Sequence, residues 1–130
     1  MTLRLATGLW VFSTASDRYC ADGYRDVPRT VDVLATIAKL KGIKGVEVRQ
    51  TDITPDLPAK EMRRLLKEHG LVCSCVAMNL CHSRRFALSG FGHQHQKTRN
   101  APIDEGRKAV DLARALGTTE VTLRLNTDGF

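Results

Sequence analysis

Apolar and polar positions follow two recurring patterns along the chain, which predict strands that alternate with helices. Four short runs rich in valine, leucine and aromatic residues are typical of strands. Between them, apolar residues recur at helical spacing, and each such stretch begins near a proline and ends at a glycine. We predict strands over residues 3–12, 45–48, 71–77 and 120–125, with helices over residues 28–42, 58–70 and 102–117.

Four strands with one helix between each consecutive pair predict an α/β fold with parallel strands and right-handed crossovers. The run over residues 71–77 is apolar on both faces, as in strands that helices cover. The chain of 130 residues reads as one domain, whereas a closed (β/α)₈ TIM barrel takes about 250 residues. About four strands and three helices therefore make either a partial TIM barrel or a small doubly wound open sheet.

The hydropathy of the chain and its opening residues indicate the compartment in which we expect it. No apolar run approaches the roughly 20 residues that span a bilayer. The opening Met1-Thr2-Leu3-Arg4 lacks the regions of a signal peptide. We expect a cytoplasmic protein with no membrane partner.

The formal net charge is +6, which raises the question of an anionic partner. The basic residues are scattered along the chain, whereas a nucleic-acid site needs a focused patch. We do not expect a nucleic-acid partner. A small basic α/β module that binds an anionic ligand or nucleic acid stays open as the alternative.

The chain has four cysteines, and none of their spacings is C-x-x-C. Cys73 and Cys75 alternate within a predicted strand, so we expect them on the same face. We interpret all four as free thiols that act as small apolar side chains.

Ligands of parallel α/β folds gather at the carboxyl ends of the strands, which directs attention to the residues placed there. Glu47, Arg49 and Asp52 belong to the second strand and its loop. A carboxylate inside a parallel strand is costly unless it is paired or functional, so Glu47 is a candidate catalytic residue. Trp10, at the end of the first strand, either stacks on a sugar ring or packs in the core.

The polar segment over residues 78–101 is long for a connection inside a compact domain and carries three of the four histidines. His82 follows the third strand and could act as an acid or base, or bond a sugar hydroxyl. The other interpretation is an exposed loop histidine. His93 and His95 form an H-x-H pair without a nearby acidic ligand, so we predict no metal site within this chain.

Several segments resemble, in order, the xylose isomerase-like TIM barrels, a family of sugar isomerases and epimerases. They are Gly8-Leu9-Trp10-Val11-Phe12, Gly45-Val46-Glu47-Val48, Glu68-His69-Gly70-Leu71, Val76-Ala77-Met78-Asn79-Leu80, Phe86-Ala87-Leu88-Ser89-Gly90, Ala109-Val110-Asp111-Leu112-Ala113 and Val121 to Phe130. The last resembles the strand-four signature of the family, although Arg124 and Asn126 stand where tryptophan and glycine are usual.

The resemblance implies a metal-dependent isomerase or epimerase of a sugar or sugar phosphate that uses Mn²⁺, Mg²⁺ or Co²⁺. It implies catalytic roles for Glu47 and His82, and sugar contacts for Trp10, Asn79 and Asp128. In the family most metal ligands come from strands beyond the fourth. We therefore expect the N-terminal half of a barrel with an incomplete metal site and no activity of its own. We expect it to self-associate or to bind a complementing half.

Overall fold

The computed structural model describes residues 4–80, 84–86 and 89–125 of the chain. Strands and helices alternate, and short 3-10 helices (η) follow three of the strands or their loops. The elements are β1 (Leu5–Gly8), η1 (Leu9–Phe12), α1 (Thr30–Lys39), β2 (Ile43–Arg49), η2 (Gln50–Asp52), α2 (Ala59–Glu68), β3 (Val72–Ala77), η3 (Arg84–Phe86), α3 (Gln96–Leu116) and β4 (Val121–Thr122).

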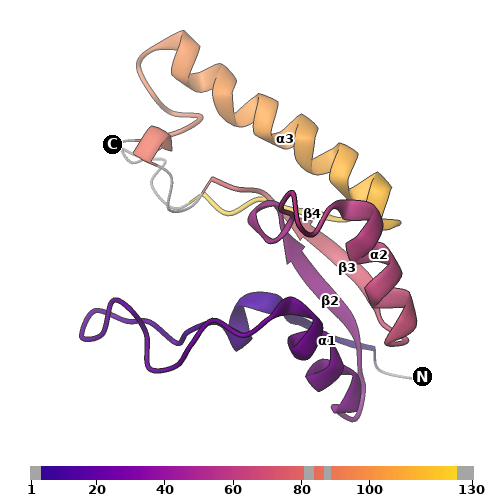
Figure 1. Cartoon of the computed structure of the whole chain (residues 1–130). Coiled ribbons are helices and arrows are strands. Elements are labelled where there is room, and N and C mark those ends of the chain that lie inside the picture. The colour runs from indigo at the N-terminus through magenta and orange to yellow at the C-terminus, as the bar shows by residue number, and fades with distance from the viewer. Residues whose placement is uncertain (1–3, 81–83, 87–88, 126–130) are drawn as a thin grey trace.

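The described strands form one sheet in the order β1-β2-β3-β4 (Figure 1). Every strand pairs in parallel with the strand that precedes it in the chain. The predicted α/β class with four parallel strands and three helices is confirmed. The order does not reverse anywhere, so these strands are not the doubly wound sheet of the alternative interpretation.

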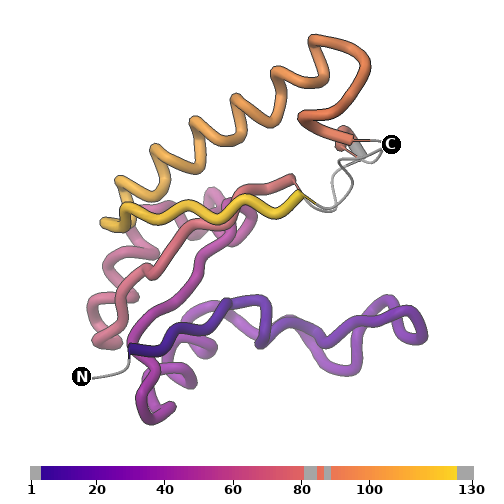
Figure 2. The backbone as a smooth tube through the Cα atoms, turned by 180° about the vertical axis from the view of Figure 1, so that it is seen from behind, coloured from indigo at the N-terminus to yellow at the C-terminus, as the bar shows by residue number. Residues whose placement is uncertain are grey.

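The helices cover one face of the sheet. α1 packs against β2 and α2, and α2 in turn packs against β3 and α3. Seen from behind, the strands lie nearer to the viewer than α1 and α2 (Figure 2). Right-handed crossovers between neighbouring strands produce this arrangement, because each one places its helix on the same side.

The core lies between the sheet and these helices. Its fully buried members come from α1, α2 and the helix-facing positions of the strands: Leu34, Ile37, Val46, Val48, Met62 and Val76. Burial of each such side chain contributes about 1.5–3 kcal/mol. Within the described ranges, no helix is long and apolar enough to cross a membrane.

The opposite face of the sheet, called the inner face below, carries Gly45, Glu47, Cys75 and Thr122. No described helix covers it (Figure 2). The inner face therefore carries small and polar side chains together with the exposed Val72, in contrast to the apolar face that meets the helices.

Three element boundaries differ from the sequence-based expectation. β1 ends at Gly8, which pairs with Glu47, and the chain turns into η1 although β2 continues to Arg49. α3 begins at Gln96 rather than at Pro102, which lies inside the helix and is fully buried. Burial of this proline outweighs the one backbone hydrogen bond that it cannot donate. β4 has only two residues.

Candidate functional site

An open cavity of about 300 Å³ lies at the carboxyl ends of β1 and β2. The turns η1 and η2 and the segment before α1 form its walls. Its apolar lining includes Leu9, Phe12, Val27 and Val33, and its polar lining includes Thr30, Arg49 and Asp52. Trp10 lines it as well. Trp10, Arg49 and Asp52, which the sequence places at or after the ends of the first two strands, all line this cavity.

The indole of Trp10 is held against the backbone of Gly8. A side chain at Gly8 would overlap the six-membered ring of this indole, so only glycine fits. Trp10 is half-buried and contributes to the cavity wall. Both sequence interpretations describe part of the geometry, because the ring packs on Gly8 and also faces the cavity.

Arg49 and Asp52 form the polar wall of the cavity. The Asp52 carboxylate accepts hydrogen bonds from the Arg49 backbone N–H at 2.8 Å and from its Nη2 and Nε at 2.9 and 3.2 Å. The Arg49 guanidinium lies 5.7 Å from the centre of the Trp10 ring, a cation–π distance. The Asp52 side chain is only 10% exposed, so it holds the guanidinium from the buried side of the ion pair.

Glu47 lies on the inner face, level with Gly8 of β1 and Cys75 of β3. Thr122 of β4 donates a hydrogen bond from Oγ1 to the Cys75 sulfur at 3.3 Å. Burial raises the pKa of the Cys75 thiol, and the adjacent Glu47 carboxylate raises that pKa further. Three neighbouring strands thus place a carboxylate, a thiol and a hydroxyl side by side.

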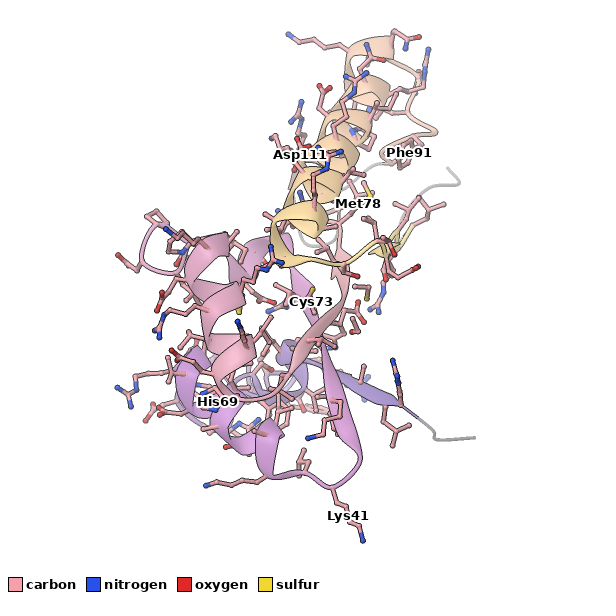
Figure 3. All side chains as sticks on the ribbon, turned by 90° about the vertical axis from the view of Figure 1, so that its right-hand side faces the viewer. Lys41, His69, Cys73, Met78, Phe91 and Asp111 are labelled. Carbon is pink, nitrogen blue, oxygen red and sulfur yellow. The ribbon has the colours of Figure 1, made fainter. Side chains whose placement is uncertain are left out.

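Cys73 and Cys75 point to opposite faces, so the prediction of a shared face is wrong. Ser74 is an extra residue in the register between β2 and β3, a β-bulge that reverses the alternation. Cys73 pairs with the buried Val46 and lies between β3 and α2 (Figure 3). Burial raises the pKa of Cys73 to about 12, so this thiol is not a nucleophile.

Asn79 follows β3 but does not line the cavity. Its backbone N–H donates to Oε1 of Gln50 at 2.6 Å, and Nε2 of Gln50 donates to the Glu105 carbonyl at 3.2 Å. Gln50 therefore ties the ends of β2 and β3 to α3. Sequence reasoning missed Gln50, and its position directly after the second strand was the available signal.

The predicted site residues Glu47 and Asn79 do not line the cavity. His82 and Asp128 lie outside the described residues. His93 and His95 stand just before α3, where His93 Nδ1 accepts a hydrogen bond from the His95 backbone at 3.0 Å. Arg99 holds the same turn by donating to the His93 carbonyl at 2.8 Å.

The described residues do not fit a divalent metal. Within residues 4–80, 84–86 and 89–125, no three His, Cys, Asp or Glu side chains converge as a metal site requires. Glu47 has a thiol and a hydroxyl beside it, and Asp52 is engaged by Arg49. We therefore derive no chemical step through a metal.

Comparison of the sequence with models of known protein families finds no match, and comparison with curated proteins finds no relative. The resemblance to xylose isomerase-like barrels thus remains a sequence-based prediction.

Proposed function

We propose that this chain forms part of a (β/α)₈ barrel of the sugar isomerase and epimerase class, and that its cavity binds a sugar ring. The observation that carries the proposal is the strand order β1-β2-β3-β4 with all three described helices on one face. A barrel wall has this arrangement, and its ligands bind at the carboxyl ends of the strands. The cavity lies at that edge of the sheet.

The lining of the cavity suits a sugar. Trp10 offers an aromatic surface on which the C–H groups of a pyranose can pack, while Thr30 and Arg49 offer hydrogen bonds to hydroxyl groups. The cavity volume, about 300 Å³, lies at the lower end of the range for small-molecule sites. A monosaccharide is therefore the size of ligand that we infer.

Glu47 does not line the cavity; it lies on the inner face, two residues before Arg49 of the cavity wall, and we propose it as the base of the complete barrel. Isomerisation and epimerisation of sugars require a base that removes a proton next to a carbonyl group, and a carboxylate on the inner face of a barrel can do this. The metal that the family resemblance implies would need ligands from other strands. We therefore propose that the four strands bind sugar without turnover, and that further strands complete the reaction centre.

The placement of charge gives less support to the nucleic-acid alternative. Arg64 pairs with Glu61 and Glu68 on its own helix, and Lys108 pairs with Glu105 at 2.9 Å. Such pairs neutralise basic side chains where a nucleic-acid surface would leave them available.

Intrinsic fluorescence tests sugar binding directly, because Trp10 is the single tryptophan of the chain. We expect xylose, glucose or fructose at millimolar concentration to shift or quench its emission saturably. The same mixtures, with Mn²⁺ added, should show no isomerised sugar by chromatography.

The control separates stacking from general surface effects. Phe12→Ala, at the cavity wall, should weaken the fluorescence response, whereas Tyr19→Ala, an aromatic residue that is 76% exposed and distant from the lining, should leave it unchanged. An emission spectrum unaffected by any sugar would contradict the binding proposal. Turnover by the chain alone would contradict the requirement for further strands.

A further inference from the structure

The Arg49 guanidinium is held in a fixed position at the cavity wall, with donors left over. Nε and Nη2 both donate to Asp52 Oδ1, and Cζ lies 5.7 Å from the centre of the Trp10 ring. Within the described part of the chain, Nη1 has no hydrogen-bond partner. The Arg49 side chain is 43% exposed, so this nitrogen remains accessible to a ligand. A guanidinium anchored in this way loses little side-chain entropy when it binds a further group.

Asp52 does not compete for such a ligand. Its Oδ2 accepts the Arg49 backbone N–H and its Oδ1 accepts the guanidinium, and its side chain is nine-tenths buried. The ion pair therefore presents donors to the cavity and hides its acceptors. A ligand that matches this wall brings acceptor oxygens.

The surroundings of the cavity add positive potential. The Nε of Arg25 donates to the carbonyl of Ser13, a lining residue, at 2.6 Å, which places a second guanidinium at the rim. α1 begins at Thr30, another lining residue, so the positive end of its dipole also faces this region. Among the lining residues Arg49 and Asp52 carry opposite charges, and Arg25 adds a cation beside Ser13.

We propose that the cavity binds a sugar that carries an oxyanion, with Arg49 as the contact for a phosphate ester or carboxylate group and Trp10 as the contact for the ring. A planar guanidinium matches both kinds of oxyanion. The inference of a ring rests on the proposed function, whereas the oxyanion contact rests on Arg49 alone.

Titrations of the Trp10 fluorescence at constant ionic strength test this, with four probes: glucose, glucose 6-phosphate, glucuronate and inorganic phosphate. We expect glucose 6-phosphate or glucuronate to bind about tenfold or more tightly than glucose, as one charge-assisted contact allows. Whichever of the two binds more tightly identifies the oxyanion as a phosphate ester or as a carboxylate.

Variants assign the effect to Arg49. Arg49→Gln combined with Asp52→Asn, which avoids an unpaired buried carboxylate, should abolish the preference for the charged sugars. Arg49→Lys should retain part of it. Arg18→Gln is the matched control, because Arg18 stacks on Tyr19 away from the cavity. Circular dichroism verifies that each variant is folded.

The outcomes separate the two proposals. Equal affinity for glucose and its charged forms would overturn this inference and leave the sugar proposal standing. Phosphate binding that depends on Arg49, without any sugar binding, would support the oxyanion contact and overturn the sugar proposal. An equal loss in the Arg18→Gln variant would show general charge attraction and would overturn the inference.

Discussion

At the scale of single residues, the bulge at Ser74 determines which side chains meet on the inner face. Thr118 Oγ1 donates a hydrogen bond to the Ser74 carbonyl at 3.0 Å, next to the bulge. The bulge also brings Cys75 level with Glu47. In a regular strand without the bulge, Cys73 and Cys75 would share a face, and Glu47 would lack its sulfur neighbour.

We predict that Glu47→Gln accelerates alkylation of Cys75. The Glu47 carboxylate raises the pKa of the thiol, so its removal lowers that pKa and increases the thiolate fraction at a given pH below it. Iodoacetamide at pH 8 should label Cys75 several-fold faster in the variant. Tandem mass spectrometry measures this labelling separately from that of the other cysteines.

Thr122→Val is the control, because we expect it to change the alkylation rate of Cys75 in the opposite direction. The Thr122 hydrogen bond lowers the pKa of Cys75, so its loss should slow the same reaction. Equal rates in the parent and in Glu47→Gln would show that the carboxylate does not act on this thiol.

At the scale of elements, α3 contains one glycine and ends at another, and the two have different surroundings. Gly106 lies inside the helix, and a Cβ there would meet the Met78 side chain at an ordinary 3.4 Å. Gly117 caps the helix with φ near +81°, and a Cβ there would lie 3.2 Å from the Arg63 guanidinium. Only the second position uses the conformational freedom of glycine.

We predict that Gly106→Ala raises the free energy of unfolding by about 0.5–1 kcal/mol, because alanine loses less backbone entropy in a helix. Gly117→Ala should lower it by about 1 kcal/mol, because alanine is strained at positive φ. Urea denaturation of the two variants measures both changes. A destabilised Gly106→Ala would indicate that Met78 cannot accommodate the added methyl group.

The order of the elements was predictable from the sequence, whereas several boundaries were not. The hydrophobic period predicts each strand and helix from local sequence, and the predicted order agrees with the elements observed. The three helices also end shortly before the predicted glycines, Gly42, Gly70 and Gly117. β1 ends at Gly8 although β2 continues to Arg49, and the apolar run through Phe12 does not reveal where pairing stops. The early start of α3 depends on burial of Pro102, a tertiary contact that overrides its local preference for the first turn.

The same division applies to the candidate site. Topology alone places Trp10, Arg49 and Asp52 at one edge of the sheet, and the sequence revealed this. The contact between Glu47 and Cys75 depends on a one-residue bulge, which no alternating pattern reveals. The bridge from Gln50 to α3 depends on one side-chain conformation.

At the scale of the whole molecule, the four described strands leave both outer strands and the inner face open. Exposed leucines accompany the two edges, with Leu5 on β1, and Leu123 and Leu125 directly after β4. Open strands with exposed apolar side chains favour pairing with another chain. The expectation of self-association, or of a complementing half, thus has a physical basis.

We predict that the chain self-associates in a concentration-dependent manner and that Leu5→Lys weakens this association, because a lysine on an edge strand opposes pairing. Val31→Lys on α1 is the control, since Leu5 and Val31 are both 45% exposed. Sedimentation velocity over a range of concentrations measures the effect. A monomer at every concentration, or an equal effect of both variants, would count against edge pairing.

The pairing of each strand with its predecessor also affects how the chain can fold during translation. Every interstrand contact closes over a single helix and its flanking loops, of which the longest precede α1 and α3. Contacts of this range require little loop-closure entropy. Each newly translated βα unit can therefore dock on the one already outside the ribosome, so assembly proceeds in the direction of translation.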